Sequence, residues 1–150
     1  HAGVPMMLAT LGGPAETFKY TIDAYREALE ESGFDPAAFP VATAGLFNAA
    51  ETTQEALAEV YPHVDKGMMR TNGRGYPQSA FMHGAEKESV MNIGSPQEII
   101  EKILYQHEMF GHQRYIAQMD FGGVPFGRLE RNIELIATEI LPAIRKYTKK

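Results

Sequence analysis

Two glycine pairs follow short apolar runs, at places where backbone N–H groups can face an anionic ligand. Gly12 and Gly13 come after an apolar run that ends at Thr10, and they directly precede a predicted helix. A helix N-terminus binds anions readily because its first N–H groups have no partner within the helix. Glycines also permit a tight turn without any ligand, and no full Gly-x-Gly-x-x-Gly pattern occurs here. Thr10, Gly12 and Gly13 are therefore candidate binding residues, with a simple turn as the alternative.

A carboxylate and the second glycine pair lie where the last predicted strand ends. Asp120 is followed closely by Gly122 and Gly123. In parallel α/β folds, ligands bind at the carboxyl ends of the strands. Asp120 could therefore bond a ligand, or it could cap the turn that follows.

Residues 70–90 interrupt the regular alternation of the chain and are predicted to form a mobile loop. Most connections are about 4–6 residues long, whereas this stretch is far longer. Gly73, Gly75 and Gly84 loosen the backbone, Pro77 blocks regular pairing, and no sustained helical or strand periodicity runs through it. We expect few buried contacts to hold it.

Several kinds of catalytic chemistry have no support in the sequence. Cysteine is absent, which excludes disulfides, thiolate nucleophiles and cysteine-ligated zinc. His107 and His112 straddle Gly111, a predicted helix end, so they do not share a helical face, and no His-Glu-x-x-His or Gly-x-Ser-x-Gly pattern occurs. We expect no metal site, and we identify no catalytic acid, base or nucleophile.

Length and charge set further limits. The chain has 150 residues, enough for one domain, and a net charge of −5 that argues against binding to nucleic-acid phosphates. No apolar run approaches the ~20 residues that span a bilayer, so no membrane partner is expected. The lack of cysteine fits a reducing cytoplasm. The chain begins at His1 without a Met, which suggests a trimmed chain.

The predicted elements alternate between strands and helices. Apolar runs at 5–10, 41–47 and 115–121 are expected to be buried strands. One helix is expected from Pro14 to the stop at Gly33, and two more are expected after the capping boxes that begin at Thr52 and Ser95. A last helix is expected through the final apolar stripe. Pro62 should bend or break its helix, and Pro142 should kink the last one. Such alternation predicts a parallel sheet, with all three strands parallel and adjacent in chain order. Three strands cannot close a barrel, so the domain is either a small open layer or part of something larger.

Six segments resemble the C-terminal end of luciferase-like flavin monooxygenases. They are Gly3-Val-Pro-Met-Met-Leu-Ala-Thr-Leu-Gly-Gly13, Tyr25-Arg-Glu-Ala-Leu29 running into Gly33-Phe-Asp-Pro36, Met91-Asn-Ile-Gly-Ser-Pro-Gln-Glu-Ile-Ile-Glu-Lys-Ile-Leu104, Gly111-His112, Tyr115-Ile-Ala-Gln-Met-Asp-Phe-Gly-Gly-Val-Pro125, and Glu134-Leu-Ile-Ala-Thr-Glu-Ile-Leu-Pro142. The family fold is a (β/α)8 barrel of the TIM type. The resemblance implies that residues 1–150 are its C-terminal part, with the three strands as the sixth to eighth, and that the first five strands are not in this chain.

The resemblance also implies a function and a cofactor. The intact protein would be a monooxygenase that uses reduced flavin (FMN) and dioxygen to oxygenate a small organic substrate, with a flavin reductase as a partner. A deazaflavin-dependent oxidoreductase of the same fold is one alternative, and a non-catalytic partial barrel that serves binding or assembly is another. This chain alone is expected to be inactive.

Site residues and partners follow from the same resemblance. In the family a mobile segment near the seventh strand covers the flavin, so Arg74, and with it Arg70, becomes a candidate contact for a phosphate or a substrate anion. The alternative is a solvated loop. Thr10, Gly12, Gly13, Asp120, Gly122 and Gly123 would then be cofactor-binding residues. Unpaired strand edges predict a homo-oligomer or pairing with an N-terminal half.

Overall fold

The structure, a computed structural model, describes residues 3–149 and contains one four-stranded parallel sheet. Its strands are β1 (Met6–Thr10), β2 (Val41–Ala49), β3 (Asn92–Gly94) and β4 (Arg114–Gln118). β1 and β4 pair in parallel with the same stretch of β2, and therefore lie on its two opposite edges. β3 pairs in parallel with the last residues of β2. The predicted α/β fold with a parallel sheet is confirmed, as is the order of the three predicted strands.

The strand count from the sequence was wrong by one. β3 is only three residues long, too short to produce a recognisable alternation of apolar and polar residues. β2 is longer than expected because it extends to Ala49, and β4 ends at Gln118, so Asp120 lies two residues beyond it.

The helices follow the local signals that predicted them. They are α1 (Ala15–Glu31), α2 (Thr53–Asn72), α3 (Gln78–Met82), α4 (Pro96–Phe110), α5 (Phe126–Leu135) and α6 (Leu141–Thr148), with short 3₁₀ turns η1 (Pro36–Ala38) and η2 (His83–Ala85). Capping boxes begin α2 and α4, where Thr52 and Ser95 accept from the backbone N–H three residues on. Gly73 and Gly111 end these helices with φ of 70° and 56°, values that suit glycine.

The two prolines inside helical stretches have different effects. Pro62 does not break α2, which runs through it; it is exposed, so water can serve the carbonyl that loses its partner. Before Pro142 the helix instead forms a π-helical turn, η3 (Ile136–Ile140). A proline clashes with the carbonyl four residues earlier, and a wider turn relieves that clash.

The predicted loop 70–90 is more regular than expected. Arg70 lies in the last turn of α2, and residues 78–85 form α3 and η2. Phe81 is fully buried against the rings of Tyr61 and Tyr76 at centroid distances of 5.2 and 5.4 Å, and Val90 is buried as well. Most of the segment is nevertheless exposed, so buried contacts are few, as expected, and Phe81 is its main anchor. The mobility of the segment stays a prediction.

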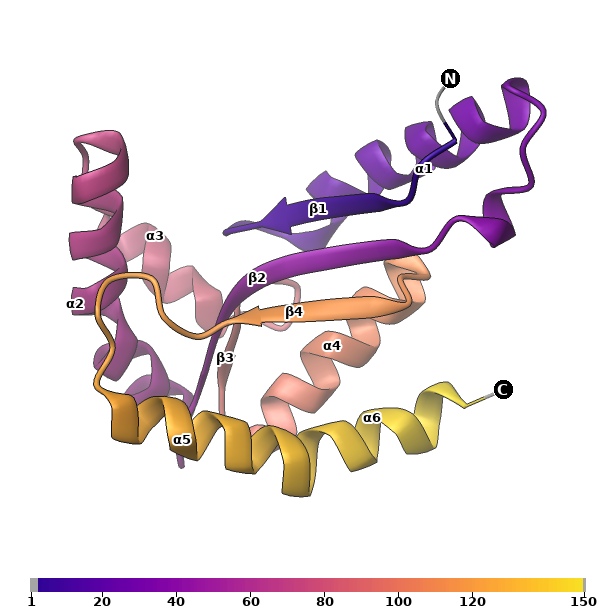
Figure 1. The fold of residues 1–150 in the computed structure, drawn as a ribbon. Coiled ribbons are helices and arrows are strands. Elements are labelled where there is room, and N and C mark those ends of the chain that lie inside the picture. Colours follow the sequence, from indigo (N-terminus) through magenta and orange to yellow (C-terminus); the bar gives the residue numbers. More distant parts are fainter. Residues whose placement is uncertain (1–2, 150) are drawn as a thin grey trace.

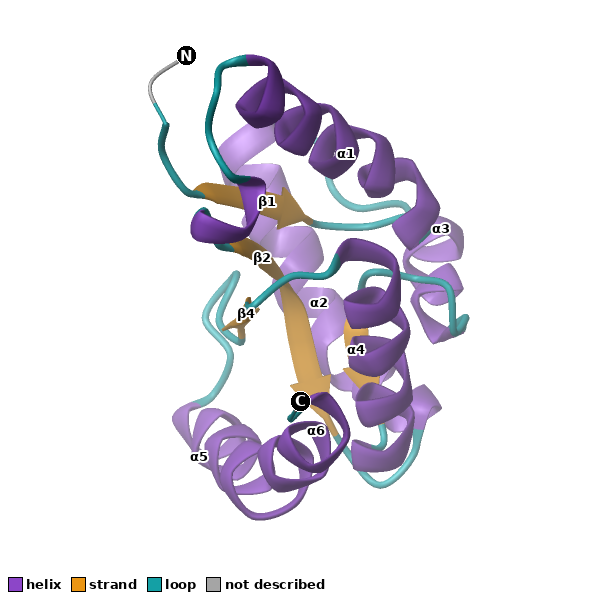
Figure 2. Cartoon of the chain, turned by 90° about the vertical axis from the view of Figure 1, so that its right-hand side faces the viewer, coloured by secondary structure: helices purple, strands orange, loops and turns teal. Residues whose placement is uncertain are grey.

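One face of the sheet is covered and the other is open. Figures 1 and 2 both show α1, α3 and α4 on the same side of β1, β2 and β4, with no helix over the opposite side of these strands. On the covered side, Val41 and Phe47 are 1% and 2% exposed. On the open side, Met7 is 64% and Ile116 is 41% exposed. The outer edges of β1 and β4 have no strand partner among residues 3–149.

Candidate functional site

Helix α2 lies across the carboxyl ends of β1 and β4, the edge at which the candidate residues were predicted (Figure 1). Its backbone touches the loop that follows β4: Gly67 has no room for a Cβ because the carbonyl and ring of Phe121 occupy that space, and Gly122 is blocked in the same way by the carbonyl of His63. Glycine is thus required on both sides of this contact. The role of Gly122 in the structure is close packing of the loop on α2.

The end of β1 is held by tertiary contacts rather than left open for a ligand. Thr10 is 1% exposed, and its hydroxyl donates to the carbonyl of Ala44 at 3.2 Å. The hydroxyl of Tyr76 lies against Gly12, where it leaves no room for a side chain. Gly13 has a φ of +91° and nothing lies within 4 Å of its missing Cβ. Of the three residues predicted here, Gly13 is the one with open space beside it.

The N-terminus of α1 is partly used by the protein itself. The N–H of Ala15 donates to the carbonyl of Glu88 at 2.7 Å, and the N–H of Val90 donates to the carbonyl of Gly13 at 3.0 Å. These bonds form a short antiparallel bridge between Pro14 and Ser89. One of the free donors that an anion would use is therefore already satisfied.

Asp120 caps the turn that follows β4. One carboxylate oxygen, Oδ1, accepts from the N–H groups of Gly123 at 2.8 Å and Val124 at 3.0 Å. These backbone donors hold the pKa of the Asp120 carboxyl below its usual range. Gly123, with a φ of +84°, completes the turn. The structure thus supplies the turn-cap role that the sequence left open, while the second oxygen, Oδ2, has no hydrogen bond among the described residues.

Arg74 lies just beyond α2, in the turn that leads to α3. Its side chain is exposed and forms no hydrogen bond or ion pair within residues 3–149. The turn itself is fixed, because the N–H of Tyr76 donates to Asp65 at 2.9 Å. No hydrogen bond or ion pair joins Arg74 to Asp120 or to the glycine pairs in the described part of the chain. Its role as an anion contact remains a prediction.

A buried polar network at the end of β2 was missed by sequence reasoning. Asn48 and Asn132 are 1% and 0% exposed, and the amide of Asn132 donates to the oxygen of Asn48 at 3.1 Å. Glu59 of α2 accepts from Asn48 at 3.3 Å and from Arg131 of α5 at 2.7 Å. The hydrogen bond from Arg131 lowers the pKa of Glu59. This network ties α2 and α5 to the end of the central strand.

Within residues 3–149, no group of three or more His, Asp or Glu side chains is arranged to hold a metal ion. His107 and His112 do come together, with ring centroids 5.6 Å apart, although His112 lies outside the helix. Among the described residues, none of the helices combines the length and hydropathy needed to cross a membrane.

Comparisons with known proteins relate the chain to one family. Residues 2–113 match the family model described as luciferase-like monooxygenase. None of the curated proteins compared with the chain matches it in sequence.

Solved structures share the fold. The monooxygenase RslO1 from Streptomyces bottropensis matches with a TM-score of 0.70 and 27% identity, over 94% of this chain and 42% of its own. The oxygenating constituent of 3,6-diketocamphane monooxygenase from Pseudomonas putida, in complex with FMN, gives 0.63 and 18%, over 89% and 42%. The coenzyme F420 dependent tetrahydromethanopterin reductase from Methanopyrus kandleri gives 0.63 and 16%, over 92% and 45%. The chain thus spans less than half the length of these proteins.

Proposed function

Because this chain belongs to the luciferase-like monooxygenase family, we propose that it is the C-terminal part of a (β/α)8 barrel that oxygenates a small organic substrate. In this proposal β1, β2 and β4 are the sixth, seventh and eighth strands. The observation that carries it is the parallel order β1–β2–β4 with helices on one face alone. An arc of a barrel has this form, since helices cover the outside of a barrel and its inner face borders the lumen.

Reduced flavin, with FMN as the first choice, would supply the chemistry that activates dioxygen. The residues present fit one wall of such a site. Arg74 is a cation without a protein partner, Gly13 has open space beside it, and the Oδ2 atom of Asp120 is free to accept from a hydroxyl. Thr10 does not fit, because it is buried and its hydroxyl is already bonded to Ala44.

In this proposal the residues of this chain bind and orient the cofactor and the substrate. Arg74 would hold an anionic group of the cofactor or substrate, and α2 would shield the carboxyl ends of the strands from water. The Glu59–Arg131 pair would fix α2 in that position. The opposite wall, and the flavin reductase and substrate contacts, would come from outside this chain. A deazaflavin cofactor is the alternative, since the FMN-bound oxygenase and the F420-dependent reductase match the fold with the same TM-score of 0.63.

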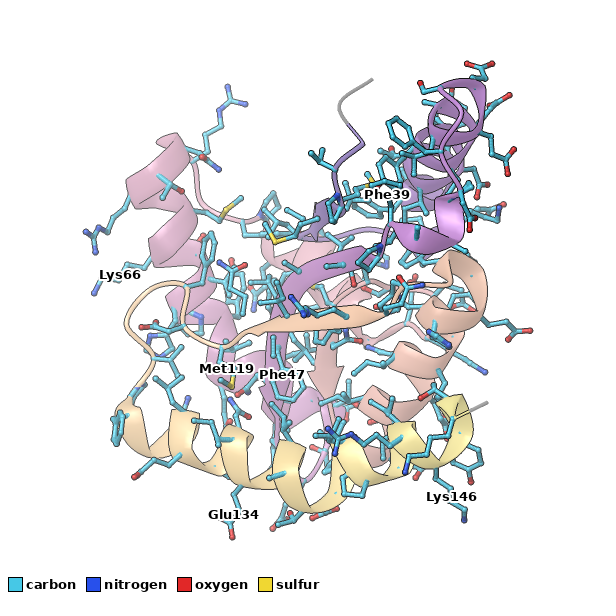
Figure 3. The ribbon with its side chains drawn as sticks, turned by 45° about the vertical axis from the view of Figure 1, so that its right-hand side comes forward. Phe39, Phe47, Lys66, Met119, Glu134 and Lys146 are labelled. Carbon is cyan, nitrogen blue, oxygen red and sulfur yellow. The ribbon has the colours of Figure 1, made fainter. Side chains whose placement is uncertain are left out.

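The test is to express this chain together with the residues encoded upstream of it. We expect a yellow FMN complex and oxygen uptake that depends on reduced flavin. Arg74→Gln should weaken FMN binding about tenfold, as expected for loss of a charge-assisted bond. Lys66→Gln is the matched control, because the side chain of Lys66 is exposed on α2 and points away from the sheet (Figure 3).

A complex without chromophore and without oxygen uptake would instead favour a non-catalytic binding or assembly module.

Light scattering on this chain alone measures whether the unpaired edges of β1 and β4 make it associate. We propose that they cause self-association, or pairing with the N-terminal half. A monomer at all concentrations would contradict this.

A further inference from the structure

A cavity lies on the helix-covered side of the sheet, away from the carboxyl ends of the strands. Its volume is about 530 Å³ and it lies between the sheet, α4 and the η3–α6 helix. Cavities of about 300–1,000 Å³ are the usual size for small-molecule sites. The inner wall is apolar and comes from three layers: Phe47 and Ala117 from the strands, Ile103 from α4, and Ile136 and Ile140 from η3. Figure 3 shows Phe47 on the side of the sheet toward this helix.

Four polar residues of the lining come from one end of the molecule. The C-terminal ends of α4 and α6 and the start of β4 lie at the same end of the molecule (Figure 1). They contribute His112, Gln113, Arg145 and Thr148 to the lining. The cavity is therefore amphipathic, with an apolar inner end and a polar rim.

The rim offers donors to an anion. Arg145 is exposed and has no ion pair within residues 3–149. The side-chain oxygen of Gln113 accepts from the N–H of Val41 at 2.8 Å, so its amide N–H groups are left as donors. His112 is buried, and burial lowers its pKa to about 4, so it stays neutral and adds no charge.

We propose that this cavity binds an amphipathic carboxylate, a medium-chain fatty acid in its simplest form. The hydrocarbon chain lies against Phe47, Ile103, Ala117 and Ile140, and the carboxylate lies at the rim beside Arg145 and Gln113. The π-helical turn η3 forms part of the wall, and π-helical turns recur at functional sites. The site is separate from the proposed flavin site, so it does not depend on the proposed function.

Titration of the protein with sodium decanoate tests the site, followed by the NMR signals of the isoleucine methyl groups. We expect saturable shifts for Ile103, Ile136 and Ile140. Ala117→Leu fills the inner end and should weaken decanoate binding about tenfold. Ala9→Leu, the same change on the open face of β1, is the control and should leave binding unchanged.

The head group is tested by a second pair of variants. Arg145→Gln should weaken decanoate binding about threefold, the size typical of an exposed ion pair, and should leave decanol binding unchanged. Lys146→Gln, one residue along and outside the lining, should change neither. This comparison changes no core residue, so it tests whether the cavity binds a carboxylate even if Ala117→Leu does not fold.

Three results would overturn the proposal. Shifts that do not saturate would mean that no site exists. Equal binding to the Ala117→Leu and Ala9→Leu variants would place the ligand elsewhere. Equal effects of Arg145→Gln and Lys146→Gln would exclude the carboxylate as the recognised group.

Discussion

The buried lysine of α4 should give the protein a stability that rises at alkaline pH. Lys102 is 2% exposed, and its ammonium group donates to three backbone carbonyls, those of Gly84, Met91 and Ile93, the last two at 3.3 Å. Burial lowers its pKa from 10.5 to about 8. Below pH 8 the lysine is charged in both the folded and the unfolded chain. Between pH 8 and 10.5 the unfolded chain binds more protons, so the free energy of unfolding rises with pH.

The size of the effect follows from that interval. At 1.36 kcal/mol for each pH unit, the interval between the two pKa values is worth about 3 kcal/mol. Urea unfolding followed by circular dichroism, from pH 7 to 10.5, measures it. Lys102→Met removes the titrating group, so the wild-type free energy of unfolding should gain about 3 kcal/mol relative to this variant across the range.

Other groups also titrate in this range. Burial raises the pKa values of Tyr76 and Tyr115, which works in the opposite direction, but both tyrosines are present in the variant and cancel in the difference. Lys66→Met, at an exposed position of α2, is the control and should keep the wild-type slope. Parallel curves for wild type and Lys102→Met would refute the idea that the burial of this lysine controls its charge.

Three further predictions concern the contacts around α2 and the strand ends. Gly122→Ala should destabilise the protein by about 3 kcal/mol through overpacking against α2, whereas Gly127→Ala, with open space in α5, should stabilise it by about 0.5–1 kcal/mol; equal thermal shifts would contradict this. The wild type should lose stability as the pH falls through the low pKa of Asp120, and Asp120→Asn should remove this loss, because the amide keeps an acceptor for the turn but does not titrate. The same loss of stability at acid pH in the variant would contradict this. Phe81→Ala should cost about 3–5 kcal/mol and speed tryptic cleavage after α2 at least about tenfold, whereas the exposed Phe126→Ala should not; resistance to trypsin would contradict that anchor.

The features that could be predicted from the sequence are those with local signals. The capping boxes at Thr52 and Ser95 lie within four residues of their own partners, and they placed the starts of α2 and α4 correctly. The apolar runs placed β1 and β2. β3 could not be predicted in this way, because three residues are too few to show a periodicity. Its pairing with residues 47–49 of β2 is set by tertiary contacts.

The contacts of the site are mostly between distant parts of the sequence. Glu59 and Arg131 are 72 residues apart, and no spacing rule relates them. The packing of Tyr76 on Gly12 has the same character, since it depends on where α3 and its preceding turn come to lie. Asp120 is the intermediate case. Its turn-cap role was one of two alternatives weighed from the sequence, because its bonds to residues three and four positions on are local. Its role in binding a ligand stays a prediction.

The two faces of the sheet differ in the size of their side chains, and this difference concerns what the open face would contact. The covered face carries Val41 and Phe47, which fill the space beneath the helices. At the middle of the open face the side chains are much smaller, with Ala9, Ala42 and Ala44 on adjacent strands. Barrel interiors are typically filled with bulky branched residues, and this face also carries the large side chains of Met7 and Ile116. The alanines beside them leave room for a ligand or for large side chains from an opposite wall. In the proposed barrel this face would border the lumen, and its alanines would give the proposed flavin or substrate a surface to lie against.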